Sequence, residues 1–374
     1  MQSLREMADN GKTVILVTHS TLQLQMCDKI VFMGAGGNLC FCGSYDEALA
    51  FFGVDNIVDV YNMITFQAKE WSAKYAQLAP PVGPSRKAAQ APAKPIVDHK
   101  HQLKVLCSRY MKLVFNDKQR LWLLLLQAPL LALLIAMVAD GDQFEKYEMT
   151  KSLLFALSCC AFWIGILNAI QEICKERTIL KREYMTGLSL GSYVQSKVIV
   201  LGGMCLVQST MVVLVFALLV GVPDSGVMLP SVLELYISTF LTALSAAAMG
   251  LFVSSLFDNA DRAMTVAPIL LMPQILFSGQ LFKLEGVTSV ISWFVTCRWS
   301  MEGLGSTADL NDLPNKMEQA AEKAGMSTRG MHPSEDFYDT EPGHLLLVWG
   351  ILIVSVVLFL YLSKRMLKKI DKEQ

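Results

Sequence analysis

The pattern of apolar and polar positions divides the chain into a mixed N-terminal part and a part dominated by long apolar runs. Residues 1–53 contain only short apolar stretches. Six later runs approach or reach the roughly 20 residues that a helix needs to cross about 30 Å of hydrocarbon. These runs are 121–139, 153–170, 198–222, 232–257, 263–281 and 345–362. The pattern predicts a mainly α-helical membrane protein with six transmembrane helices.

Polar side chains interrupt several of these runs. Such residues inside a span face protein or water rather than lipid, so they are candidates for a transport pathway. They could equally hydrogen-bond one helix to another. The candidates are Asn168, Gln171, Gln208 and Gln274. Two prolines, at 268 and 273, are expected to kink the fifth span, either along a transport route or as a simple packing feature.

The first part of the chain, residues 1–55, has the pattern of a soluble α/β segment. The continuous β-branched run at 12–18 (KTVILVT) is typical of a buried parallel strand. The stretches 29–33 (KIVFM) and 38–43 (NLCFCG) predict two strands joined by a glycine-rich turn. A helix with Ser44 as its N-cap follows.

Residues 56–96 connect this segment to the membrane part through a helix and a Pro/Ala-rich linker. Residues 97–117 then predict an amphipathic helix. Its apolar arc contains Leu103, Leu106, Cys107, Tyr110, Leu113 and Val114. Such a helix suits the membrane surface, although a core-packing helix has the same pattern. The six-span domain is expected over 118–363.

Composition and charge narrow the possible partners and set an orientation. With 53% hydrophobic and 17% charged residues and a net charge of −1, the chain has no field that favours nucleic acid. The CFC cysteines (40 and 42) have no second pair, so no metal site is predicted. Lys and Arg concentrate in 171–197 and in the tail 364–374, whereas the predicted outer loop, 282–344, is acidic. The positive-inside rule therefore places both termini in the cytoplasm.

His19 is the main catalytic candidate. It follows the apolar run at 12–18, and ligands bind at the carboxyl ends of strands in open α/β sheets. An imidazole there can contact a γ-phosphate, although a histidine after a strand can also be purely structural. The nearby Gly-Lys-Thr at 11–13 is not a phosphate loop, because it precedes a strand instead of following one.

The order of these parts resembles a known family. VILVTHS followed by CDKIVFMGAGGNLCFCGSYDEALAFFG resembles the end of an ABC-transporter nucleotide-binding domain. A linker, an amphipathic helix and six spans then resemble the White/Pdr-type (subfamily G) half-transporters, which carry an ABC-2-type permease. Two further stretches resemble that family's cytoplasmic loop after span two and its re-entrant helices after span five. They are QEICKERTILKREYMTGLSLG (171–191) and FSGQLFKLEGVTSVISWFVTCRWSMEGL (277–304).

The resemblance implies roles for three residues. His19 would be the switch histidine, and Glu176 and Arg177 would lie near the coupling helix that contacts the ATPase. ATP and Mg would be the cofactors of the full-length transporter. The phosphate loop, signature and Walker B motifs would lie upstream of Met1, so the chain is expected to be an N-terminally truncated fragment that does not hydrolyse ATP alone.

The resemblance also implies partners and a location. A second half-transporter and the lipid bilayer are the expected partners, in the plasma membrane, with export of a lipid-like or amphipathic substrate. Two alternatives remain open: the 171–197 segment as a plain solvated basic loop, and the chain as a non-catalytic permease-like protein. The region of Trp293, Arg298, Trp299 and Glu302 matches the family but is equally typical of an aromatic belt.

Overall fold

The computed structural model describes residues 1–18, 20–21, 23–78, 99–141, 143–282, 284–315 and 336–369. The chain forms two compact units, Met1–Pro95 and Ile96–Gln374. His19 and the 79–95 linker lie outside the described residues.

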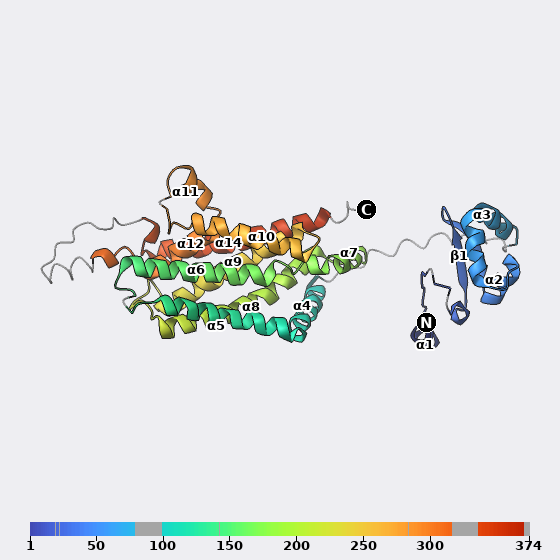
Figure 1. The fold of residues 1–374 in the computed structure, drawn as a ribbon, viewed down its shortest axis with the longest axis horizontal. Helices are drawn as coiled ribbons and strands as arrows, with labels where there is room; N and C mark the ends of the chain where they lie inside the picture. The colour runs from blue at the N-terminus through green and yellow to red at the C-terminus, as the bar shows by residue number, and fades with distance from the viewer. Residues whose placement is uncertain are drawn as a thin grey trace. The chain divides into compact units, whose positions relative to one another are not determined.

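The N-terminal unit is built around a β-hairpin and two helices (Figure 1). After α1 (Gln2–Asp9) and the short η1 (Leu24–Met26), strand β1 (Ile30–Gly34) pairs antiparallel with β2 (Asn38–Gly43). Phe32 lies opposite Phe41 in the hairpin, and a bulge follows at Met33. Helices α2 (Tyr45–Phe52) and α3 (Ile57–Leu78) complete the unit. The predicted hairpin and the helix after Ser44 are therefore present.

Local signals in the sequence explain the start and end of α2. The Ser44 hydroxyl accepts from the Glu47 backbone N–H, while the Glu47 carboxylate accepts from the Ser44 N–H, which forms a capping box. Gly53 ends the helix in the left-handed region with φ 66°. Behind the hairpin, Phe52 and Val60 pack in a buried aromatic and aliphatic cluster.

The run at 12–18 differs from its predicted strand. It has no regular secondary structure, and Ile15 and Val17 are 88% and 96% exposed. A parallel strand requires neighbouring strands, and the sheet in the described part of this unit contains only β1 and β2. The segment therefore presents an apolar edge without a partner in this structure.

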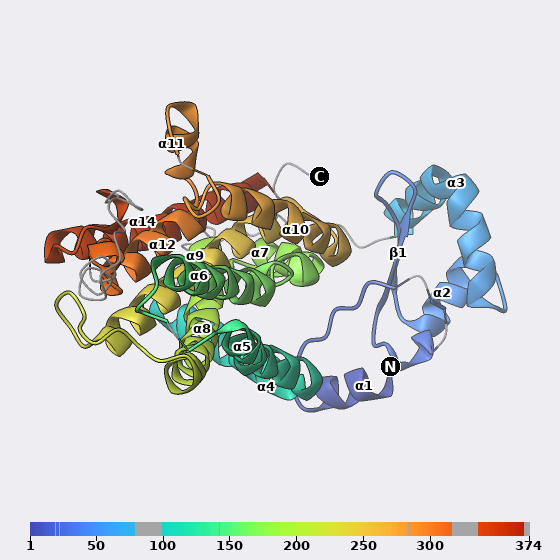
Figure 2. The same cartoon turned by 60° about the vertical axis from the view of Figure 1, so that its left-hand side comes forward.

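The second unit is a bundle of long helices (Figures 1 and 2). The long helices are α4 (His99–Asn116), α5 (Lys118–Val138), α6 (Tyr147–Ala169), α8 (Leu190–Leu219), α9 (Ser231–Leu256), α10 (Ala260–Leu276) and α14 (Pro342–Leu367). Shorter elements connect them: η2 (Cys174–Glu176), α7 (Arg177–Met185), α11 (Val287–Ser292), α12 (Thr296–Thr307) and η3 (Asp336–Tyr338).

Helix α9 forms the centre of this bundle. In the apolar 18-residue stretch of α9, 78% is buried, against 22% in α5 and 28% in α14, which lie at the periphery. Small residues bring α6 close to α9: a Cβ added at Gly165 would lie 2.0 Å from the Ala243 carbonyl oxygen. Such close approach of backbones is typical of helix pairs in membranes.

Five of the described helical segments are long and apolar enough to span a membrane: α5, Tyr147–Met185, α8, α9 and α14. The remaining predicted span, 263–281, forms α10, which has 17 residues and contains Pro268 and Pro273. The first residues of α5 and the last residues of α14 lie at the same end of the bundle (Figure 1). If each of the five long segments crosses the bundle once, the chain finishes at the end opposite to where it started. Five crossings alone therefore do not produce the observed arrangement.

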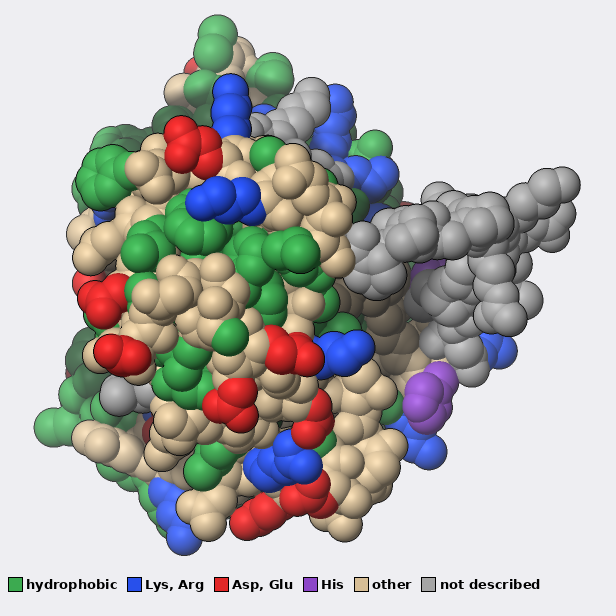
Figure 3. Space-filling view, turned by 90° about the vertical axis from the view of Figure 1, so that its right-hand side faces the viewer, with side chains coloured by type: hydrophobic (Ala, Val, Ile, Leu, Met, Phe, Trp, Pro, Cys, Tyr) green, Lys and Arg blue, Asp and Glu red, His purple; other side chains and the backbone are tan. Residues whose placement is uncertain are grey.

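Charged side chains of both signs are mixed on the face drawn in Figure 3. The side of the molecule in Figure 3 presents Asp and Glu interspersed with Lys and Arg and with apolar side chains. No large area of one charge sign faces the viewer there.

Candidate functional site

Buried charges gather where α4 meets α5, α6 and α8, at the end of the bundle that also holds the 171–191 loop. Amphipathic α4 packs on α8 through the buried Leu106 and Tyr110, two members of its predicted apolar arc. The last turn of α4 and the first turn of α5 are therefore held against the segment that follows α6. We call the group formed by Tyr110, Arg120, Glu172, Glu176, Tyr193 and Lys197 the buried charge cluster.

Glu172 joins α4 and α5 to the segment after α6. The Glu172 residue is only 4% exposed, and its carboxylate accepts a 2.5 Å hydrogen bond from the Tyr110 hydroxyl. The Arg120 guanidinium donates to its other oxygen. Two helices are thus connected to one carboxylate, with both of its oxygens engaged.

Lys197 connects the same region to α8. Its ammonium lies 2.9 Å from a Glu176 oxygen and 4.0 Å from a Glu172 oxygen, and the residue is 1% exposed. The Lys197 Nζ also lies 3.6 Å from the centre of the Tyr110 ring, a cation–π geometry. Tyr193 donates a 3.0 Å hydrogen bond to Glu176. A buried charge is tolerated when it is paired in this way.

The Tyr110 hydroxyl acts as a fixed donor in the buried charge cluster. Burial raises the pKa of Tyr110 well above its ordinary value, and the negative charge of Glu172 raises it further. The phenol therefore stays protonated at neutral pH and donates to Glu172.

Arg177, the other predicted coupling residue, makes a separate set of contacts. Its Nε lies 2.6 Å from an Asp258 oxygen, and its Nη1 donates to the Ser255 carbonyl at 3.2 Å. Ser254 accepts from the backbone N–H groups of Ile173 and Cys174 at 2.9 and 3.1 Å. Glu176 thus contacts Lys197 of α8, while the next residue, Arg177, fastens the same loop to the end of α9.

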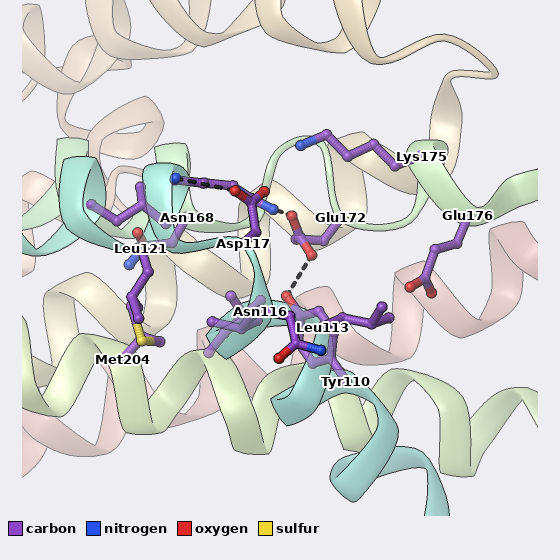
Figure 4. A pocket seen from close by; sticks show the side chains of 14 residues that line it. Tyr110, Leu113, Asn116, Asp117, Leu121, Asn168, Glu172, Lys175, Glu176 and Met204 are labelled. Atoms are coloured by element: carbon purple, nitrogen blue, oxygen red, sulfur yellow. Dashed lines mark hydrogen bonds and ion pairs between the residues drawn. The ribbon is translucent and has the colours of Figure 1, made fainter.

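A cavity of about 410 Å³ opens beside the buried charge cluster (Figure 4). One part of its wall is apolar and includes Leu121, Leu124, Leu201 and Met204. The other part carries polar groups, among them Asn116, Asp117, Arg120, Asn168, Glu172 and Lys175. The cavity thus has an apolar side and a charged side, and its size falls within the range of small-molecule sites, roughly 300–1,000 Å³.

The predicted pathway residues are distributed over different places. Asn168 and Gln208 meet: the Asn168 Nδ2 donates to Gln208 Oε1 at 2.5 Å, and Gln208 Nε2 donates to the Leu124 carbonyl at 2.7 Å. Gln274 instead accepts from the Cys297 backbone N–H at 2.9 Å, which ties α10 to the start of α12. Gln171 is half-buried at the end of α6. These contacts correspond to the alternative in which amides join helices.

A second buried charged group lies on α12. The Arg298 guanidinium lies over the Trp299 ring at 4.5 Å and donates to the Ser292 hydroxyl at 3.0 Å. Glu302 lies 3.7 Å from Arg298 and 3.5 Å from the His344 Nε2. Burial raises the pKa of Glu302 to about 7, and the nearby positive charge of Arg298 opposes that shift.

Lys197, Tyr110 and Glu172 of the buried charge cluster were not predicted as site residues, and only Lys197 has a signal in the sequence. Lys197 stands at the start of an apolar run, and an ionisable residue at such a position marks a functional or structural pair. Tyr110 and Glu172 carry no comparable signal, because their proximity depends on how α4 packs on α8. The switch-histidine assignment of His19 falls on a residue outside the described part of the chain.

Comparison with known proteins agrees with this architecture. Residues 101–307 match the family described as "ABC-2 type transporter". The chain is also similar to the "ABC transporter ATP-binding/permease protein Rv1747" of Mycobacterium tuberculosis (strain ATCC 25618 / H37Rv), with 27% identity over 330 residues, 84% of this chain. The chain spans 38% of the length of that relative.

The family match includes α4, the buried charge cluster and α12, and covers more than half of the 374 residues. With its long apolar helices and a small N-terminal sheet, the structure confirms the predicted fold class. The chain is a multi-pass membrane protein that belongs to the ABC-2 type transporter family.

Proposed function

We propose that this chain is the membrane part of an ATP-driven transporter of the White/Pdr (subfamily G) type, with the 171–191 loop as its coupling element. The observation that carries the proposal is the buried charge cluster. Glu172 and Glu176 connect that loop to α4, α5 and α8 at once. A displacement of the loop therefore pulls on three helices through paired buried charges instead of being absorbed locally.

The N-terminal unit supports the link to ATP. We propose that the exposed apolar segment 12–18 joins the sheet of an ATP-binding domain, whether that domain belongs to the same polypeptide or to a partner. Ile15 and Val17 are exposed to water without such a sheet, and burying their apolar surface in it would favour assembly. The relative from Mycobacterium tuberculosis is named an ATP-binding/permease protein, which agrees with this pairing of parts.

The remaining parts of the proposal concern assembly and position. A second half-transporter, identical or related, supplies the other half of the translocation path. ATP and Mg are bound by the complete ATP-binding domains, with His19 near the γ-phosphate. Both termini lie in the cytoplasm, because Lys and Arg concentrate in 171–197 and 364–374. The plasma membrane is the proposed location, as the family resemblance implies. An amphipathic, lipid-like substrate fits the apolar character of the spans.

Vanadate-sensitive ATP hydrolysis tests the proposal. The chain, purified from native membranes with its ATP-binding part, is expected to hydrolyse ATP. His19→Ala should abolish hydrolysis, and the neighbouring Thr21→Ala should not. Glu176→Gln should preserve hydrolysis but weaken its response to added substrate, because the loop loses its contact with Lys197. Absence of any associated ATPase would instead favour a permease-like protein without an ATP-driven cycle.

A further inference from the structure

The cavity beside the buried charge cluster combines two features that the coupling role does not require. Its apolar wall, made by Leu121, Leu124, Leu201 and Met204, extends from the first turns of α5 to α8. Its polar wall begins at the same turn of α5, where a spanning helix emerges from the membrane. An amphiphile lying along α5 would therefore meet each wall with the matching part of its own structure.

Two cations with unused donors face the polar end of this cavity. The guanidinium of Arg120 uses Nη2 for Glu172, and its other N–H groups have no partner among the described contacts. Lys175 lines the same cavity within electrostatic reach of Arg120, and the described residues provide no hydrogen bond or ion pair to its ammonium. In Figure 4 that ammonium points toward the side where Asp117 and Glu172 lie.

Three carboxylates line the cavity, those of Asp117, Glu172 and Glu176, but they do not remove the need for an anion. Glu176 is paired with Lys197 and accepts from Tyr193. Glu172 already accepts from Tyr110 and Arg120, so both of its oxygens are engaged. Asp117 is exposed and accepts from the Arg120 backbone N–H, which caps α5. An anionic group between Arg120 and Lys175 would relieve the repulsion between two like charges and receive charge-assisted hydrogen bonds.

We propose that this cavity binds a membrane phospholipid, with the phosphate held by Arg120 and Lys175 and the first part of an acyl chain along the apolar wall. A bound phosphate competes with Glu172 for Arg120, so occupancy changes the contact that joins α5 to the coupling loop. That consequence rests on the proposed transport function, whereas the binding itself does not.

Native mass spectrometry of the purified chain tests the binding directly. The probes are dihexanoyl phosphatidylglycerol, dihexanoyl phosphatidylcholine and sodium phosphate. The wild-type chain should retain one phosphatidylglycerol molecule, and Lys175→Gln should weaken its apparent affinity about tenfold, the loss of one charge-assisted contact. Lys118→Gln is the matched control, because Lys118 lies on α5 two residues before Arg120 but does not line the cavity. Its affinity should change less than twofold.

A second variant tests the apolar wall. Met204→Trp fills the chain-binding part and should abolish retention of both lipids while the melting temperature stays within a few degrees of wild type. Equal losses in Lys175→Gln and Lys118→Gln would overturn the proposal in favour of a nonspecific surface effect. Displacement of the lipid by an equal concentration of sodium phosphate would also overturn it, as a free-anion site. ATP hydrolysis enters none of these measurements, so their failure would leave the proposed transport function intact.

Discussion

At the scale of single residues, Lys197 is the cation around which the buried charge cluster is arranged. It lies against two carboxylates from the 171–191 loop and a tyrosine ring from α4. The sequence pointed to Glu176 through a family resemblance, and the position of Lys197 at the start of an apolar run was visible as well. The contact between Tyr110 and Glu172 could not be predicted, because 62 positions separate them and only packing brings them together.

Replacing Lys197 with methionine should destabilise the fold. The substitution takes the shared cation away from Glu176 and Glu172, while Arg109 still lies 3.9 Å from Glu176 and Arg120 still pairs with Glu172. The expected loss is therefore about 2 kcal/mol, typical of a hydrogen bond to a charged group. Melting temperatures in detergent provide the measurement. Lys118→Met, at an exposed lysine, should have little effect. Equal melting temperatures for the two variants would show that Lys197 is not structurally paired.

Glu302 should make stability depend on pH. Its pKa in the folded protein is about 7, raised from an ordinary value of 4.5, so the folded state binds the proton more tightly than the unfolded state. The resulting stabilisation is present below about pH 4.5 and is lost as the pH rises through 7, a change of roughly 3 kcal/mol.

The comparison of Glu302→Gln with wild type isolates this effect, since Arg298 and His344 remain in place. Melting curves between pH 4.5 and 8 should be flatter for the variant, which should be the more stable protein at pH 8. Glu341→Gln, at an exposed carboxylate at the start of α14, should keep the wild-type slope. An unchanged slope in Glu302→Gln would contradict the burial effect.

At the scale of elements, the sequence located the helices well because spanning segments require long apolar runs. The predicted runs 121–139 and 345–362 lie within or nearly within α5 and α14. The local signals for the β1–β2 hairpin and the α2 capping box were equally sufficient. The strand at 12–18 failed for the opposite reason: a β-strand depends on partners that a local pattern cannot supply.

The close contact between α6 and α9 should be sensitive to substitution at Gly165. A methyl group at Gly165 would collide with the Ala243 carbonyl, so Gly165→Ala should reduce the yield of monodisperse protein and lower the melting temperature. Gly203→Ala on α8, where a Cβ meets open space, should leave both unchanged or slightly improved. Fluorescence-detected size exclusion measures both variants, and identical behaviour would show that α6 and α9 do not approach this closely.

At the scale of the whole molecule, α10 decides the topology. Its 17 residues rise about 25 Å, slightly less than the hydrocarbon thickness of about 30 Å. If α10 crosses, six crossings return the chain to its starting side. If it does not, the five long segments leave the two ends on opposite sides. The proposed coupling requires the 171–191 loop and both ends on the side where ATP is available.

Cysteine labelling with a membrane-impermeant maleimide, in intact cells and after permeabilisation, tests this claim most directly. In a cysteine-free background, we expect Arg182→Cys and Lys369→Cys to react only after permeabilisation, and Gln143→Cys to react in intact cells. Reaction of Lys369→Cys in intact cells would place the C-terminal end of α14 outside and contradict the six-crossing, ATP-coupled account.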